Sequence, residues 1–451
     1  MTDTTTLKRE PSAFLRWMAL LLISLAMCGN YYIYDSISPL ADLIKEQLKF
    51  TDSEIGLLNA IYSFPNIIMV LIGGIIIDKI GTRKSAFIFT LFIMVGALVT
   101  ALKGNIVLMA TGRLIFGLGA ESMIVAITTI IARWFKGKEL SFAFGLNLTL
   151  ARLGSFLALN SPTWGKSLYS YWQSPLWVTV GAGVFAVVFM SVYYFLDVYA
   201  SKKYNMPVEG SQDKIIFKEI FKFGTSFWFI TALCVTFYSA MFPFQTFAIK
   251  FFQEAHGTTR EVGGNLSSIL TLFAMIFTPL FGLLADKIGK RSLMMMFGSL
   301  LIIPVYLMMA YRVFSGSITG GFHVEMAFFG IEQAVIPYYL IIPMGMMGIA
   351  FSMIPAIMWP SVALVVPEEK LGTAYGLMTM IQNIGLFGFN ILIGFTNDVS
   401  NASATNPGGY TPGMWIFSIL GFLGLFFAYM LRRAENKKSG HTLEMGSIHK
   451  K

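Results

Sequence analysis

Long apolar segments recur along the whole chain, and they constrain its fold more than any other feature. Each is roughly 20 residues or longer, the length of helix that crosses the hydrocarbon core of a bilayer. Only 13% of the 451 residues are charged, about half the share of an average soluble protein. The sequence therefore predicts an all-α integral membrane protein and excludes a soluble enzyme or a nucleic-acid-binding protein. Twelve spans are predicted, at about residues 13–35, 54–77, 84–102, 105–132, 139–162, 176–197, 225–252, 262–285, 292–312, 337–366, 370–396 and 412–432.

The basic residues are distributed unevenly between the two sides of the predicted membrane. With both termini in the cytoplasm, 24 of the 33 Lys and Arg residues fall in cytoplasmic segments and seven in outer segments. This asymmetry is the positive-inside pattern that sets membrane topology, so the net charge of +9 requires no nucleic-acid partner. The apolar run after Arg16 is long enough to span, and no small-residue cleavage site follows it. It is therefore predicted to be a span and not a cleaved signal peptide.

The polar stretches between spans predict the domain organisation. The longest cytoplasmic connection, residues 198–224, is rich in Lys and follows the sixth span, as a linker between two halves would. The predicted units are an N-terminal six-helix bundle (1–197), this linker, a C-terminal six-helix bundle (225–432) and a cytoplasmic tail (433–451). An unusually long outer segment at about 312–336 can be a lid, a docking surface or a tolerated loop.

A short motif occurs twice, after the second span and after the eighth. Residues 74–84 read GIIIDKIGTRK, and residues 282–292 read GLLADKIGKRS. Glycine permits a tight turn, and the Asp and basic side chains can pair across helix ends, which would hold one bundle in one state. Two copies in matching places predict two pseudo-symmetric halves. The candidate gating residues are Gly74, Asp78, Gly81 and Arg83 in the first copy, and Gly282, Asp286, Gly289 and Arg291 in the second.

Two charged residues fall near the middle of predicted spans. Glu121 lies 11 residues before the end of the fourth span at 132, and Arg152 lies 13 residues after the start of the fifth at 139. At 1.5 Å per residue they lie about 16 and 20 Å from the same membrane face. Because a charge in the bilayer core costs about 2.5–3.5 kcal/mol on insertion scales, both are functional candidates.

Two interpretations of this pair are open. In one, Glu121 and Arg152 form an ion pair that only ties two helices together. In the other, the carboxylate binds a substrate ammonium and the guanidinium binds a substrate carboxylate; pairing in the empty state that opens for substrate would satisfy both. Glu121 is also a candidate proton acceptor, with Arg113 and Asp35 as further candidates for coupling. Arg113 has an equally strong alternative, bonding to backbone carbonyls or snorkelling to the interface.

Aromatic and amide side chains near proline-broken spans complete the candidate substrate site. Trp359 lies between Pro355 and Pro360, which release backbone groups that must face a cavity or find partners. Each of the other aromatic candidates is of a type that more often packs or lies at the membrane interface than contacts a ligand, and the two amides can bind substrate or another helix. No span carries a nucleophile–base pair, metal cluster or phosphate loop, so neither an enzyme nor a cofactor is predicted. The remaining candidates are Tyr31, Tyr34, Tyr62, Tyr375, Gln382 and Asn383.

The repeated motif and twelve spans resemble the major facilitator superfamily. The segments GRLIFGLGAES (112–122), LARLGS (150–155), MWPSVALVVPE (358–368) and IQNIG (381–385) resemble one branch of it, the lysosomal dipeptide uniporters of animals. The resemblance implies alternating-access uniport of dipeptides, with the family's functional Glu, Arg and Trp at Glu121, Arg152 and Trp359. It also implies that the charged pair holds the peptide termini.

The chain departs from the animal proteins at its N-terminus, MTDTTTLKREPS, which shows no dileucine-type sorting signal. A plasma or inner membrane location is therefore expected. A functional monomer is also expected, and the need for an accessory subunit stays open. The first rival is a proton-coupled symporter of peptides or other small carboxylates, although CGNYYIYD (28–35) lacks the ExxER cluster of proton-coupled oligopeptide transporters. The second rival is a non-transporting membrane receptor. The charges near the middle of the spans argue against it, because charges without a function only cost insertion energy.

Overall fold

The computed structural model describes residues 10–135, 139–204, 223–313, 315–316, 318, 320–324, 334–367, 370–437 and 443–444; within these ranges the side chains of residues 70, 71, 78, 141, 323, 324 and 334 are not described. Twelve helices of 20 residues or more run along the described chain, one for each predicted span. They are α1 (Ala13–Asp35), α3 (Asp52–Ile80), α4 (Thr82–Leu102), α5 (Ile106–Phe135), α6 (Leu140–Leu159), α8 (Gln173–Lys203), α9 (Thr225–His256), α10 (Arg260–Ile288), α11 (Arg291–Ala310), α12 (Tyr338–Val365), α13 (Leu371–Val399) and α14 (Thr411–Glu435).

Eleven of these helices, judged on the described residues, are long and apolar enough to cross a membrane. The helix outside that set, α3, has 29 residues and contains three of the positions whose side chains are not described. It packs lengthwise against α5 and α13. An all-α membrane protein is thus confirmed.

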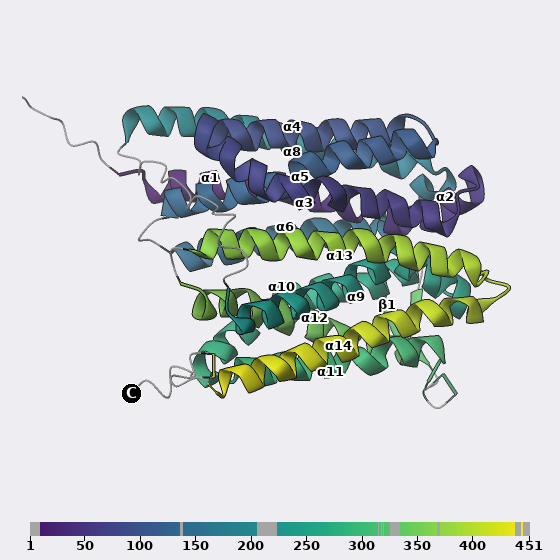
Figure 1. The fold of residues 1–451 in the computed structure, drawn as a ribbon. Coiled ribbons are helices and arrows are strands. Elements are labelled where there is room, and N and C mark those ends of the chain that lie inside the picture. Colours follow the sequence, from purple (N-terminus) through teal and green to yellow (C-terminus); the bar gives the residue numbers. More distant parts are fainter. Residues whose placement is uncertain are drawn as a thin grey trace, which may run out of the picture.

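The helices run nearly parallel to one common axis (Figure 1). The start of α1 and the end of α14 lie at one end of the molecule, called here the termini end; the other is called the opposite end. Helices α1, α4, α5, α6 and α8 pack mainly on one another and on α3, and helices α9, α10, α11, α12 and α14 pack mainly on one another and on α13. The two sets, with α3 in the first and α13 in the second, are called the N-half and the C-half, and their main contacts are α3 with α13 and α6 with α10.

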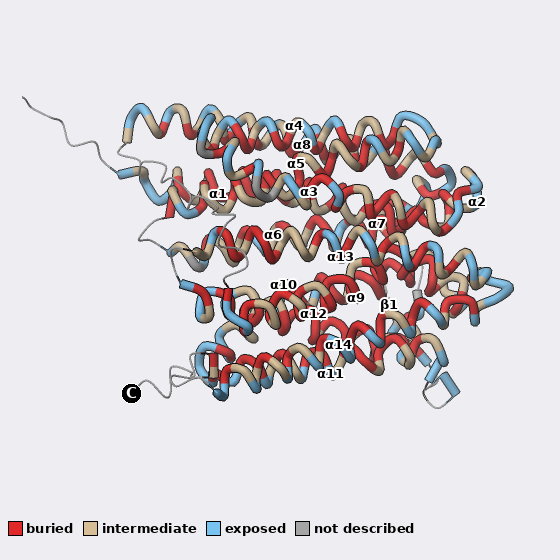
Figure 2. Tube along the Cα trace, viewed as in Figure 1, coloured by how far each residue is buried: buried red, intermediate tan, exposed pale blue. Residues whose placement is uncertain are grey.

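Short elements that the sequence did not predict gather at the opposite end. They are η1 (Ser38–Leu40), α2 (Ala41–Leu48), α7 (Ser161–Trp164), η2 (Lys166–Ser170) and η6 (Pro407–Tyr410). In the long outer segment, β1 (Gly321–Val324) pairs antiparallel with β2 (Ala334–Pro337). Burial follows the interior of the bundle, and many outward-facing apolar side chains are exposed, as a lipid-facing surface requires (Figure 2).

The two halves approach most closely at the opposite end, through glycines. A Cβ added at Gly56 of α3 would overlap the carbonyl oxygen of Asn390 on α13, and one added at Gly394 would overlap that of Asp52. Such contacts allow helix backbones to pack closely. Asp398 caps the first turn of α3 by accepting hydrogen bonds from the backbone N–H groups of Asp52 (2.8 Å) and Ser53 (2.7 Å).

Charged side chains also join the halves at this end. Lys250 of α9 donates to Asp52 Oδ2 of α3 at 2.8 Å, and both side chains are fully buried. Lys250 also contacts Glu254 (3.3 Å) and donates to the Tyr410 hydroxyl (2.8 Å). A second ion pair joins Arg260 to Asp42 across the halves. The described conformation is therefore closed at the opposite end.

The two copies of the repeated motif occupy equivalent turns at the termini end. Gly81 (φ 85°) joins α3 to α4, and Gly289 (φ 72°) precedes α11 in the C-half, so both turns need a left-handed backbone. Arg291 pairs with Asp286 at 2.7 Å, as the motif predicts, although Asp286 is 73% exposed. The side chain of Asp78 lies outside the described set. Gly74 and Gly282 lie within α3 and α10.

The partner of Arg83 comes from a residue that the motif does not contain. Arg83 binds Asp197 of α8 at 3.1 Å, and Asp197 is completely buried. Arg133 approaches the same carboxylate at 3.4 Å, and the Trp134 indole donates to it at 3.1 Å. These contacts all lie within the N-half and tie α4, α5 and α8 together.

Candidate substrate site between the two halves

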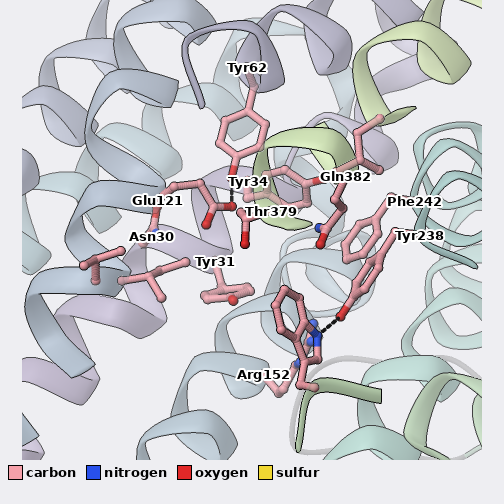
Figure 3. Close-up of a pocket in the computed structure, with 14 residues that line it drawn as sticks. Asn30, Tyr31, Tyr34, Tyr62, Glu121, Arg152, Tyr238, Phe242, Thr379 and Gln382 are labelled. Carbon is pink, nitrogen blue, oxygen red and sulfur yellow. Dashed lines mark hydrogen bonds between the residues drawn. The ribbon is translucent and has the colours of Figure 1, made fainter. Parts of the chain in front are cut away.

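A cavity of about 280 Å³ lies between the halves (Figure 3). This volume is close to the lower bound of small-molecule sites, about 300 Å³. Eight lining residues come from the N-half and six from the C-half, so a ligand that fills the cavity touches both. The lining residues are Asn30, Tyr31, Tyr34, Tyr62, Glu121, Ile124, Val125, Arg152, Tyr238, Phe242, Trp359, Thr379, Gln382 and Leu386.

Glu121 reaches the cavity from α5. Its Oε1 accepts a hydrogen bond of 2.9 Å from the Tyr62 hydroxyl of α3, drawn in Figure 3. The ring of Tyr62 packs edge-on against Tyr34, with centroids 4.9 Å apart. This contact fixes one carboxylate oxygen, and the structure describes no hydrogen bond to the other. Glu121 can therefore accept further hydrogen bonds from a cation in the cavity.

Arg152 reaches the same cavity from α6. Its guanidinium carbon lies 5.6 Å from the centroid of the Tyr31 ring and 5.1 Å from that of Phe351 on α12. Such cation–π contacts hold the planar group while leaving its edges available. The structure describes no hydrogen bond and no ion pair of the Arg152 side chain with another described residue. Its N–H donors can therefore bind a carboxylate by two parallel bonds.

Glu121 and Arg152 do not pair with each other in the described structure. Each instead has the separate partners given above, so the ion pair expected for the empty state is absent from this conformation. Glu121 lies 14 residues before the end of α5, and Arg152 lies 12 residues after the start of α6. These separations correspond to about 21 and 18 Å along the two helices. The two charges are thus at similar heights, with the cavity available between them.

The C-half supplies an aromatic wall. The Trp359 indole donates to the Tyr238 hydroxyl at 3.0 Å, also drawn in Figure 3. Tyr238 stacks on Phe242, with centroids 5.6 Å apart and an interplanar angle of 15°. Tyr375 donates to the backbone carbonyl of Trp359 at 3.0 Å. Pro355 and Pro360 are accommodated within α12, which is continuous from Tyr338 to Val365, so the expected break of the helix is absent.

Four candidates lie away from this cavity. Tyr375 contacts Trp359 through the hydrogen bond to its backbone carbonyl given above. The Asn383 amide donates to the backbone carbonyl of Thr379 at 3.0 Å. Asp35 lines a second, smaller pocket at the interface between the halves. Arg113 is 2% exposed and donates to the carbonyls of Ile33, Leu58 and Tyr34 and to the Asn59 amide oxygen. For Arg113 these contacts agree with the carbonyl-binding alternative.

Several residues of the site were not identified from the sequence. Asn30, Thr379, Tyr238 and Phe242 belong to apolar spans and carry no formal charge, so only their position in the fold marks them. Outside the site, the buried partner of Arg83, Asp197, was detectable, because it is an acidic residue within the apolar run VYYFLDVYA. Among the described residues, no group of three or more His, Cys, Asp or Glu side chains could hold a metal ion.

Comparison with known proteins identifies the family. The model of the Major Facilitator Superfamily matches residues 21–331 and 244–450. The lysosomal dipeptide transporter MFSD1 of Bos taurus is 32% identical over 396 residues, which cover 85% of this chain and 80% of that protein. The human MFSD1 is 32% identical over 395 residues, covering 84% and 80%.

Two more distant proteins also match, one by sequence and one by fold. The probable sulfoacetate transporter SauU of Cupriavidus necator is 22% identical over 282 residues, covering 59% of this chain and 65% of that one. The crystal structure of the nucleoside transporter NupG superposes with a TM-score of 0.70 at 14% identity, covering 93% of this chain and 99% of that one. At that identity the likeness shows the fold alone. From the family model, the relatives and the helical architecture together, the chain belongs to the major facilitator superfamily of membrane transporters.

Proposed function

We propose that this protein transports dipeptides across a membrane by alternating access and works as a uniporter. In this proposal Glu121 binds the peptide ammonium and Arg152 binds the peptide carboxylate. The observation that carries it is the pairing of chemistries in one cavity: a carboxylate with one free oxygen and a guanidinium without an acceptor, held apart by their aromatic partners. A dipeptide carries both complementary charges, separated by about 7 Å when extended.

The relatives support the substrate class. MFSD1 proteins are named as dipeptide transporters and align with most of this chain. Aromatic walls such as Trp359 and Tyr238 accept varied apolar side chains, whereas charged groups at fixed positions set ligand orientation. A site of this kind binds the two termini tightly and discriminates weakly between side chains.

The proposed transport cycle moves two bundles, residues 1–197 and 225–432, about the cavity, joined by the linker 198–224. The described conformation, closed at the opposite end, then corresponds to a cytoplasm-facing state, because both termini are proposed to be cytoplasmic. The two repeated motifs, which contain Arg83 and Arg291, lie at the termini end. They would stabilise one or the other of the two alternating states at the cytoplasmic face. We further propose a functional monomer in a plasma or inner membrane, and leave the accessory subunit open.

Proton-coupled symport is the second candidate, because Glu121 is a carboxylate that faces the cavity and bonds a hydroxyl donor. The discriminating experiment is uptake of tritiated Ala-Ala into proteoliposomes, with and without an imposed pH gradient. Counterflow without a gradient supports uniport. Accumulation only with an inward proton gradient supports symport. The absence of both uptake and binding supports a receptor or structural role and refutes dipeptide transport.

A further inference from the structure

We infer that the Thr379 hydroxyl, on α13 of the C-half, binds the peptide ammonium together with the Glu121 carboxylate of the N-half. This inference rests on the proposed dipeptide function and adds a second ligand for the amine. Because the two ligands come from opposite halves, the amine of a bound peptide contacts both of them.

The Thr379 hydroxyl is available to a ligand. Threonines within helices commonly donate to a backbone carbonyl of the preceding turn, as Thr90, Thr100 and Thr149 do to the carbonyls four residues before them. The structure describes no hydrogen bond of the Thr379 hydroxyl with another described residue, and its Oγ1 keeps accessible surface in the cavity. A hydroxyl oxygen has two acceptor lone pairs, so Thr379 can accept a hydrogen bond from a cation.

Glu121 presents one further acceptor to the same cavity. Tyr62 donates to its Oε1 at 2.9 Å, whereas its Oε2 has no described partner and keeps accessible surface. A peptide ammonium carries three N–H donors, which one carboxylate oxygen does not satisfy. An N–H group that loses its water without finding another acceptor weakens binding, so the amine needs an acceptor beside Oε2.

Glu121 and Thr379 lie at the same height along the bundle, as their contacts with α3 show. The residue after Glu121 donates to the backbone carbonyl of Met69 of α3 at 3.4 Å. Helix α13 runs antiparallel to α3, with Asn390 packed on Gly56. Thr379 precedes Asn390 by 11 residues and is therefore opposite position 67 of α3. The two heights differ by two residues of α3, or about 3 Å.

The shared cavity brings the two side chains together across the interface. Both line the same space of about 280 Å³, and Figure 3 shows their side chains directed into it from opposite halves. An ammonium between them donates one N–H to Glu121 Oε2 and a second to Thr379 Oγ1. Glu121 alone would attach the amine to the N-half only.

The test compares two ligands of equal charge. At pH 6 the amino groups of Ala-Ala and N,N-dimethyl-Ala-Ala are both protonated, because an α-amino group has a pKa of about 7.7–8.0. Ala-Ala presents three N–H donors and the dimethyl ligand only one, which the charged carboxylate of Glu121 takes. Binding of each ligand to the purified protein is measured by isothermal titration calorimetry.

Variants at one position isolate the hydroxyl. Thr379→Val removes it and keeps the shape of the side chain. This variant should bind Ala-Ala about tenfold more weakly than the parent, the lower end for a hydrogen bond to a charged group, and should bind the dimethyl ligand equally well. Thr379→Ser keeps a hydroxyl and should bind Ala-Ala as the parent does. The matched control is Thr396→Val on the same helix. Thr396 donates to the Leu392 carbonyl and does not line the cavity, so this variant should bind both ligands as the parent does.

The outcomes separate this inference from the proposed function. Equal affinity of the parent and Thr379→Val for Ala-Ala would overturn the role of Thr379 while leaving dipeptide binding intact. An equal loss for both ligands, or the same loss in Thr379→Ser, would show an effect of packing and overturn the role of the hydroxyl. Because the serine variant decides this with Ala-Ala alone, the result does not depend on tight binding of the dimethyl ligand. Failure of the parent to bind Ala-Ala would overturn the proposed function and the inference with it.

Discussion

Replacing Lys250 with methionine is expected to open the opposite end of the molecule. Lys250 and Asp52 are both fully buried and join the two halves at 2.8 Å. Removing one member of a buried ion pair leaves a charge without compensation, which costs about 3–5 kcal/mol. In the open state water can reach Asp52, so the cost falls on the closed state alone.

The destabilisation of the closed state should lie near 3 kcal/mol, the lower bound of about 3–5 kcal/mol, because Asp52 keeps a second cation. Lys45 contacts Asp52 Oδ1 at 3.0 Å from within the N-half. A destabilisation of about 3 kcal/mol lowers the ratio of closed to open molecules about 10²-fold, since 1.4 kcal/mol corresponds to a factor of ten. A parent that is almost entirely closed would then show a readily detected open population.

The assay is pulsed electron paramagnetic resonance on spin labels at Glu46 and Ala404, exposed positions on opposite halves at this end. The labels are placed in a background lacking Cys28 and Cys234, the two native cysteines. Lys250→Met should add a longer-distance population that the parent lacks.

Two control variants test whether the uncompensated charge of Asp52 causes the opening. Lys45→Met removes a lysine that is 31% exposed and does not cross between the halves, so it should leave the distances nearly unchanged. The double variant Asp52→Asn with Lys250→Met leaves no lone charge at this pair, and its closed population should largely recover, as a double-mutant cycle measures. Identical distance distributions for the parent and Lys250→Met would refute the reasoning.

Three further predictions concern the site and the helix contacts. Arg152→Ala should abolish calorimetric binding of free dipeptides, and C-terminally amidated peptides should already bind poorly to the parent; equal binding of amidated and free peptides would remove the assigned role of Arg152. Glu121→Gln should weaken binding of unblocked peptides more than of N-acetylated ones, whereas equal losses would show that this carboxylate does not bind the amine. Gly394→Ala should lower the unfolding temperature of the purified protein by forcing α13 away from the Asp52 carbonyl; Gly388→Ala on the same helix, with open space around it, is the matched control, and equal effects of the two would contradict the close-packing argument.

The helices and the buried charges were predictable because the bilayer penalises every ion and every unpaired backbone group within it. Glu121 and Arg152 stand out in apolar spans for that reason alone, and both line the cavity. Their partners were not predictable, because Tyr62, Tyr31 and Phe351 come from three other helices. The sequence left open an ion pair between these two residues, and the structure has two separately held charges instead.

Other features gave no local signal. Asp52, Lys250 and Arg260 lie at helix ends, where a charge costs little, so their pairing across the halves depends on tertiary structure alone. Thr379 is neutral and lies within a predicted span, so its unbonded hydroxyl becomes evident only when its surroundings are known. Gly81 and Gly289 were read correctly as turn residues, but the partner of Arg83 is Asp197, over a hundred residues away.

The central claim is that one cavity binds both ends of a dipeptide through opposite charges. A cryo-electron microscopy structure of the protein with Ala-Ala bound tests it most directly. The account predicts density between the halves, with the peptide carboxylate about 2.7–2.9 Å from the Arg152 guanidinium and the ammonium at the same range from Glu121. A peptide bound in the reverse orientation, or outside this cavity, would contradict it.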